Sequence, residues 1–212
     1  SDDHARTMSS VSRFDNLSIL LCRHLTEIDF HAISSEYILF IKNGDALSKY
    51  AMQCLTLRIA LSSPDLIYSD EAILYDNKNK IFNFYKTDCS PELILSCNYF
   101  GNLLCVKTCL LKKIKQIDSK CYQNFLYEIV LKILPESKVI IHIDEVLYYS
   151  YSSKEKVSYE DFYADFDQAA GRRLLENYCK ENSINASVMD ARYHGTYRVK
   201  YVIQGEPLIS II

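Results

Sequence analysis

The chain has 212 residues, of which 49% are hydrophobic and 24% charged, so it is long enough for one large globular domain or one domain with an appendage. Its net charge of −3 provides no basic surface for a nucleic-acid partner. There are only 5 glycines, and no P-loop or dinucleotide-binding glycine motif is present, which excludes those two classes of phosphate site.

Cysteine spacing and hydropathy give no sign of a zinc-binding or a membrane-spanning protein. The 8 cysteines form no C-x-x-C pair and no zinc-finger spacing, so we interpret them as reduced side chains that pack as small hydrophobic groups. No apolar run approaches the roughly 20 residues that a membrane-spanning helix needs. We therefore expect a cytoplasmic protein without a transmembrane segment, and attachment to a membrane surface is left open.

The first half of the chain predicts strands and one long helix. A compact apolar run over 16–25 indicates a buried strand, and a second run over 36–45 indicates a strand followed by a turn. Apolar residues at helical spacing over 46–63 predict a helix, which Pro64 ends. Two β-rich runs separated by a polar turn predict a hairpin over 66–85.

The second half continues the alternation of strands and helices. Ser90 and Pro91 are typical of the start of a helix. The further elements that we expect, in chain order, are a strand at 103–106, a short helix from 107, a helix at 122–134, a strand at 138–152, an amphipathic helix at 158–183 and an alternating tail at 195–212. This order predicts an α/β fold around a mostly parallel sheet, with a C-terminal helical extension.

Several segments carry a resemblance to a known family. "PDLIYSDEAILYDN", "FYKTDCSPELILSCNYFGNLLCVKTCLL", "IIHIDEVLYYSYSS" and "AGRRLLENYCKENSINASV…GTYRVKY…PLISII" resemble the family 2 glycosyltransferases, which have the GT-A fold. The last segment is similar to the one that follows a transferase domain in tandem bacterial enzymes of surface-polysaccharide synthesis. The resemblance implies a GT-A-like domain over 1–152, an extension or linker over 153–206, and over 207–212 a strand like the first strand of a following domain.

The resemblance also implies that the family's opening strand and helix are absent. Asp2 and Asp3 match acids that end the second strand of the family and contact the nucleotide base. Because the opening strand lies in the middle of a GT-A sheet, its absence would expose two strand edges. We expect 207–212 to fill that position, from the same chain or from a neighbouring copy.

The family's metal motif is altered in this chain. The resemblance implies a nucleotide-sugar donor, a glycan acceptor and a divalent metal, manganese or magnesium, held by an Asp-rich stretch. Lys42 and Gly44 stand where the family has aspartates, so Asp45 is the one candidate metal ligand, while Lys42 could meet a phosphate directly. The alternative is an ordinary turn in which Asp45 caps the next helix. We predict a relic or altered site, with Asp3, Lys42, Asp45 and Asp70 as candidate contacts to the nucleotide sugar.

The family's catalytic base is also replaced. Leu126 stands at the base position and cannot accept a proton, which makes Glu128 the candidate substitute. The alternative for Glu128 is a solvated glutamate on a helix surface. Asn98 and Tyr99 match a family segment near the acceptor.

Three functional hypotheses follow from this pattern. The first is a glycosyltransferase module that transfers a sugar from a nucleotide-sugar donor in O-antigen-like or capsule-like polysaccharide synthesis. The second is a catalytically inactive scaffold, or a domain that binds a sugar or a partner, beside an adjacent transferase domain or in a homodimer. The third is an enzyme with a metal-independent site around Lys42 and Asp45.

Overall fold

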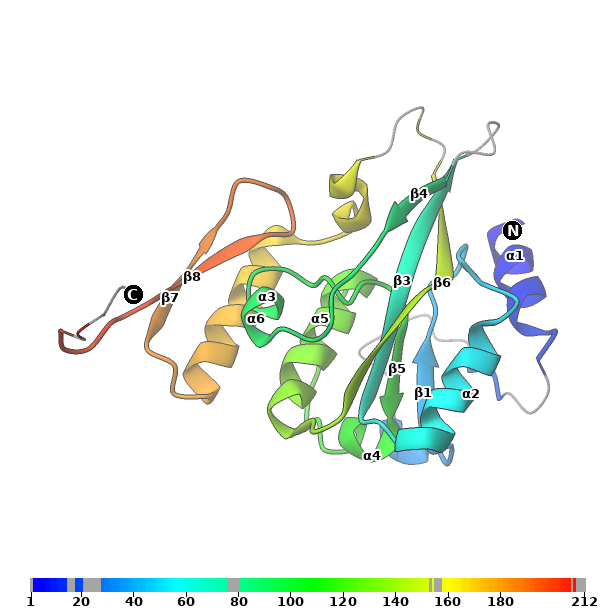
Figure 1. Ribbon diagram of the computed structural model, residues 1–212, viewed down its shortest axis with the longest axis horizontal. Coiled ribbons are helices and arrows are strands. Elements are labelled where there is room, and N and C mark those ends of the chain that lie inside the picture. The colour runs from blue at the N-terminus through cyan, green and yellow to red at the C-terminus, as the bar shows by residue number, and fades with distance from the viewer. Residues whose placement is uncertain are drawn as a thin grey trace.

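A central sheet organises the computed structural model, which describes residues 2–14, 18–20, 28–75, 81–152, 154, 158–206 and 208 (Figure 1). The strands of this sheet are β1 (Tyr37–Phe40), β2 (Ala46–Leu47), β3 (Leu66–Tyr75), β4 (Ile81–Phe84), β5 (Leu104–Lys107) and β6 (Ile140–Ser152). Their order is β1-β5-β3-β6-β2, and β4 pairs with β3.

The longest pairing in the sheet is parallel. β3 and β6 pair along their lengths, from Leu66 opposite Ile140 to Tyr75 opposite Ser152. β5 is antiparallel to both β1 and β3, so β1, β3 and β6 run in one direction, while β2, β4 and β5 run in the other. The α/β class is confirmed, with the parallel pairing in the sheet formed by β3 and β6. The predicted hairpin is also confirmed, as β3 and β4.

Helices cover the sheet. They are α1 (Asp2–Val11), α2 (Ala51–Ser62), α3 (Pro91–Ile94), α4 (Thr108–Leu111), α5 (Tyr122–Ile133) and α6 (Gln168–Glu181), with short 3-10 turns η2 (Phe30–Ala32), η3 (Leu134–Glu136) and η4 (Tyr159–Tyr163). The predicted start at Ser90 is confirmed, because its side chain accepts a hydrogen bond from the backbone N–H of Leu93. None of the described helices is both long and apolar enough to cross a bilayer.

Two helix predictions need correction. The helix expected over 46–63 begins at Ala51, because residues 46–47 form β2 beside β6. The helix expected over 158–183 is divided into η4 and α6. The division occurs at Asp167, whose side chain accepts a hydrogen bond from the backbone N–H of Ala170 and so caps α6.

Side chains that point alternately to either side of the strands give the sheet two apolar faces. Leu66 and Tyr68 pack in one cluster with Phe125 and Ile129 of α5. Ile67, between Leu66 and Tyr68 in the chain, packs in the other cluster with α2. Since successive strand residues point to opposite faces, one strand supplies both cores. Figure 1 shows α2 and α5 on the two sides of the sheet.

The C-terminal extension shares the core of the α5 face. It consists of α6 and a hairpin of β7 (Ala186–Asp190) and β8 (Tyr197–Tyr201). Tyr197 donates its backbone N–H to the carbonyl of Ser96 at 2.7 Å, and its ring is buried with Phe166 and Leu175 beside Tyr127. Gly171 permits this contact, because a Cβ there would lie 2.2 Å from the Tyr197 hydroxyl oxygen.

Two sequence predictions concern residues that the structure leaves largely undescribed. The strand expected over 16–25 has only 18–20 described, and those three residues are not in a strand. The strand expected over 207–212 lies outside the described residues except for Leu208, which is exposed. Within the described ranges β1 pairs only with β5.

Candidate functional site

The loop over 42–45 forms a tight turn that α1 holds in place. Gly44 has a φ of 101°, which favours glycine, and the backbone N–H of Asp45 donates to the carbonyl of Lys42 at 3.1 Å. Thr7 of α1 donates its hydroxyl to the Asp45 carbonyl at 2.8 Å and accepts from the Gly44 N–H at 2.9 Å. Arg6 donates to the Gly44 carbonyl at 3.0 Å. The backbone of the 42–45 loop is therefore bonded into the fold.

The side chain of Asp45 points into the protein. It is 7% exposed, and its Oδ2 accepts a 2.6 Å hydrogen bond from the Tyr148 hydroxyl, which in turn accepts from the backbone N–H of Lys42. Burial raises the pKa of Asp45 to about 7, although the Tyr148 hydrogen bond and the Lys42 charge oppose this rise. The alternative in which Asp45 caps the next helix is wrong, since Tyr50 is the N-cap of α2 and no side chain caps it.

Glu71 and Lys86 form a buried ion pair nearby. The Lys86 Nζ lies 3.7 Å from the Glu71 Oε1, and both side chains are almost completely buried. Glu71 accepts from the backbone N–H of Asn102 at 3.0 Å, and Lys86 donates to two backbone carbonyls, those of Ser69 and Phe100. Burial lowers the pKa of Lys86, and the negative charge of Glu71 opposes this shift.

Tyr122, at the start of α5, is influenced by the charges of both Asp45 and Glu71. Its hydroxyl donates to the Asn102 carbonyl at 3.3 Å, and burial together with the charges of Asp45 and Glu71 raises its pKa. The phenol is therefore neutral. We call Asp45, Glu71, Lys86, Tyr122 and Tyr148 the strand-end cluster.

The strand-end cluster does not fit a divalent metal. Across the described residues, no three His, Cys, Asp or Glu side chains are grouped so that they could hold a metal ion. The Asp45 carboxyl group is buried against a phenol, and the ammonium groups of Lys42 and Lys86 belong to the same region. A divalent cation needs several exposed oxygen ligands, which this arrangement does not supply.

Three of the predicted donor-site residues lie together. The Asp3 side chain lies beside Gly44, 3.6 Å from where a Cβ would stand; Asp45 follows that glycine, and Lys42 lies two residues before it. Lys42 forms an ion pair with Asp165, which comes from the chain just before α6. These contacts bring Asp3, Lys42 and Asp45 to one loop, and their role toward a nucleotide sugar stays a prediction.

Asp70 lies in a different environment from its neighbour Glu71. Its Oδ1 accepts from the backbone N–H of Lys86 at 2.9 Å and lies 2.8 Å from the His142 Nε2. The pairing of β3 with β6 shifts register on both sides of Asp70, and this irregularity separates the two carboxylates. Asp70 therefore links β3 to β6 through His142 and to the loop at Lys86 through a backbone hydrogen bond.

The acceptor-side candidates are both buried. Tyr99 donates its hydroxyl to the Asp88 carbonyl at 3.1 Å and accepts from the Ser90 N–H at 2.8 Å. Asn98 is 4% exposed, and its Oδ1 has no hydrogen-bond partner among the described residues. Their relation to an acceptor stays a prediction.

Glu128 is buried in a structural network on α5. Its carboxylate accepts from the backbone N–H groups of Asp118 and Ser119, and Lys132 pairs with it at 3.1 Å. The alternative of a solvated surface glutamate is wrong, because Glu128 is 2% exposed. Leu126, at the family's base position, is completely buried.

Sequence reasoning did not select Tyr122 and Tyr148 as site residues. Both occur in segments whose periodicity assigns them to the core; Tyr148 is indeed buried, whereas Tyr122 is partly buried against the core. A signal was available in their chemistry, because a buried tyrosine hydroxyl requires a polar partner and Asp45 is the nearest acid in a family motif.

Comparisons with known proteins agree with the sequence resemblance. No family model matches the chain. It is 26% identical over 189 residues to the O-antigen biosynthesis protein RfbC of Myxococcus xanthus, covering 88% of this chain and 15% of that protein. It is 23% identical over 197 residues to the uncharacterized protein y4gI of Sinorhizobium fredii, covering 89% of this chain and 22% of that protein. The chain thus spans less than a quarter of the length of these curated relatives.

Solved structures of S. aureus TarS resemble this chain at low sequence identity. S. aureus TarS 1-349 in complex with UDP-GlcNAc is 16% identical, with a TM-score of 0.41 over 70% of this chain and 49% of that one. The same fragment without that ligand gives a TM-score of 0.44 over 73% and 50%, also at 16% identity. The sequence match to an O-antigen biosynthesis protein agrees with the predicted resemblance to proteins of surface-polysaccharide synthesis.

Proposed function

We propose that this chain serves surface-polysaccharide synthesis as a glycosyltransferase-like module that does not itself transfer sugar. The observation that carries this proposal is the state of Asp45, the last carboxylate in the metal loop. It is buried and hydrogen-bonded to Tyr148 instead of facing a ligand. Its partner in polysaccharide synthesis is then an adjacent transferase domain or a second copy.

The chemistry of sugar transfer gives the reason. A transferase must stabilise the leaving diphosphate and take a proton from the acceptor hydroxyl. No group of three His, Cys, Asp or Glu side chains that could hold a metal ion occurs among the described residues, and Leu126 stands at the base position. Glu128 is occupied by two backbone N–H groups and Lys132, so using it as a base would break the contact between α5 and the preceding loop.

A second candidate function is metal-independent sugar transfer. It is favoured by the burial of Asp45, which raises the pKa of this carboxyl group to about 7, the range in which a carboxylate can act as a general base at neutral pH. In this case the donor is a nucleotide sugar, as in the TarS structure solved with UDP-GlcNAc. Lys42 would meet the diphosphate and Asp3 the nucleotide, and no metal would take part.

Donor turnover tests the proposal. The chain is incubated with UDP-, GDP- and dTDP-sugars, with and without Mn²⁺, and release of nucleoside diphosphate is measured for wild type, Asp45→Ala and Lys42→Ala. We expect no release above the rate in buffer for any of the three. Release that requires Mn²⁺ would overturn the proposal, whereas metal-independent release that both variants lose would establish the second candidate.

A further inference from the structure

A groove lies on the far side of α5 from the sheet, away from the strand-end cluster. It has a volume of about 1080 Å³ and is lined by α5, α6 and the loop over 112–121. None of the five residues of the strand-end cluster lines it. The groove is formed where α6 of the C-terminal extension packs against α5, so it requires the extension.

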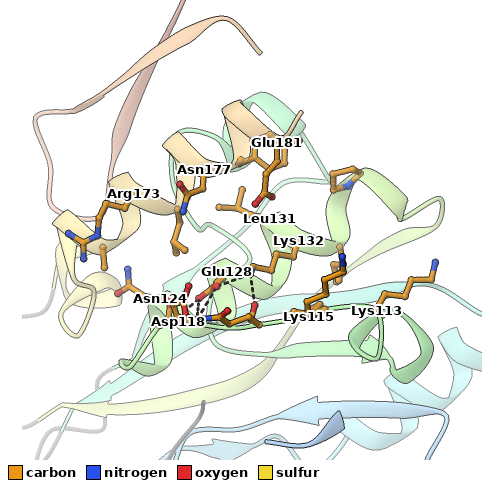
Figure 2. Close-up of a pocket in the computed structure, with 18 of the residues that line it drawn as sticks. Lys113, Lys115, Asp118, Asn124, Glu128, Leu131, Lys132, Arg173, Asn177 and Glu181 are labelled. Atoms are coloured by element: carbon orange, nitrogen blue, oxygen red, sulfur yellow. Dashed lines mark hydrogen bonds and ion pairs between the residues drawn. The ribbon is translucent and has the colours of Figure 1, made fainter. Parts of the chain in front are cut away.

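One wall of the groove is a polar face of α6. Arg173, Asn177 and Glu181 are spaced four residues apart, so their side chains lie along one face of the helix. Figure 2 shows these three residues on α6, opposite Glu128 and Lys132 of α5. All three are exposed to solvent.

Part of the charged lining is already used within the protein. Glu128 holds two backbone N–H groups and Lys132, and Lys113 forms an ion pair with Glu136. Among the described residues, Arg173 and Glu181 have no ion-pair or hydrogen-bonding partner for their side chains. The groove thus offers a free donor group and a free acceptor group on the same wall.

The balance of charges indicates what the groove can bind. Its lining contains five basic and five acidic side chains, so a polyanion would meet as many repulsive as attractive charges. Leu131, Leu174 and the half-buried Tyr178 add apolar surface between the polar groups. A sugar ring suits this mixture, because each hydroxyl both donates and accepts hydrogen bonds while the C–H faces pack on apolar side chains.

We propose that this groove binds an uncharged oligosaccharide, with Arg173, Asn177 and Glu181 contacting its hydroxyl groups. The volume of about 1080 Å³ slightly exceeds the range of about 300–1,000 Å³ for small-molecule sites, which allows more than one sugar unit. The choice of a glycan rests on the proposed role in polysaccharide synthesis. The site itself requires no sugar transfer by this chain.

The test uses the whole chain and glycans alone. Fluorescently labelled protein is applied to an array of short bacterial oligosaccharides, uncharged and acidic, and the uncharged oligosaccharide that it retains most strongly is titrated in solution. Arg173→Ala and Glu181→Gln are compared with the matched controls Arg172→Ala and Glu176→Gln. The controls lie on the same helix but do not line the groove, and Arg172 pairs with Asp190 instead.

We expect retention of an uncharged oligosaccharide, an affinity loss of about tenfold for each groove variant, and no change for either control. Three results would each overturn this assignment: the array retains no glycan, it retains only acidic glycans, or all four variants bind with equal affinity. The array contains no nucleotide sugar, so its failure leaves the proposed function untouched. Donor turnover, in contrast, would overturn that function without affecting the groove.

Discussion

At the scale of single residues, the surroundings of Asp45 favour its protonated form. Burial of its carboxyl group favours the neutral form more than the hydrogen bond from the Tyr148 hydroxyl favours the charged form. The pKa of about 7 in the folded protein exceeds the value near 4 that an unfolded aspartate has. This difference couples the protonation of Asp45 to folding.

The coupling predicts how stability depends on pH. The contribution of Asp45 is fully present below about pH 4 and is lost as the pH rises to about 7, because the unfolded chain releases its proton first. Relative to Asp45→Asn, the free energy of unfolding of the wild type should fall by up to about 1.4 kcal/mol per pH unit in this window. Urea unfolding at several pH values measures it, with Asp144→Asn, which removes an exposed carboxylate, as the control. A difference between wild type and Asp45→Asn that is independent of pH would contradict this account.

Gly101 gives a second prediction at this scale. It has a φ of 76°, and a Cβ there would lie 2.3 Å from the Glu71 Oε1 and 2.6 Å from the Lys86 Nζ. Gly101→Ala should therefore lower the free energy of unfolding by about 1–3 kcal/mol more than Gly205→Ala. Gly205 has a nearly identical φ of 78° but nothing within 4 Å of a Cβ, so it reports backbone strain alone. Equal losses in thermal unfolding would show that the buried pair is not tightly packed against Gly101.

The sequence predicts part of the candidate site at this scale. The resemblance selects Lys42, Gly44 and Asp45, and the structure places them in one turn with Asp3 beside it. It could not predict that the Asp45 side chain turns inward. That orientation depends on Tyr148, which is 103 residues away in the chain and whose periodicity marks only a core residue.

At the scale of elements, the Glu128 carboxylate fastens the loop before α5 to the helix. It accepts from two successive backbone N–H groups, those of Asp118 and Ser119, and pairs with Lys132. We expect Glu128→Gln to lower the free energy of unfolding by about 1–3 kcal/mol, because an amide N–H₂ then faces backbone donors. Denaturant titration checks this, with the exposed Glu176→Gln as control. Unchanged stability together with the loss of a donor-turnover activity would instead assign Glu128 to catalysis.

Helix boundaries show where periodicity is insufficient. The run over 158–183 has apolar residues at helical spacing, yet two of these residues pack against different elements of the fold. Phe162 packs near Phe84 of β4, whereas Phe166 packs near Tyr127 of α5. Asn124 hydrogen-bonds both the backbone N–H and the carbonyl of Asp167 and so fixes the break between η4 and α6. Contacts at such sequence separation leave no periodic signal.

At the scale of the whole molecule, alternation of strands and helices predicts the α/β class but not the strand order. β5 lies between β1 and β3 in the opposite direction, although it follows both in the chain. The family resemblance supplied the expectation of a GT-A-like sheet, which local periodicity alone does not. The close packing of the C-terminal extension against α5 was likewise not predicted, since it depends on Gly171 admitting the Tyr197 hydroxyl.

The central claim is that the chain has the architecture of a transferase module without its metal-dependent site. Isothermal titration calorimetry with UDP, GDP and dTDP, each with and without Mn²⁺, tests it most directly. We expect that Mn²⁺ will not change the heat of binding or the affinity for any of the three, because Asp45 is buried against Tyr148. Nucleotide binding that requires Mn²⁺ and is abolished by Asp45→Asn would contradict the account.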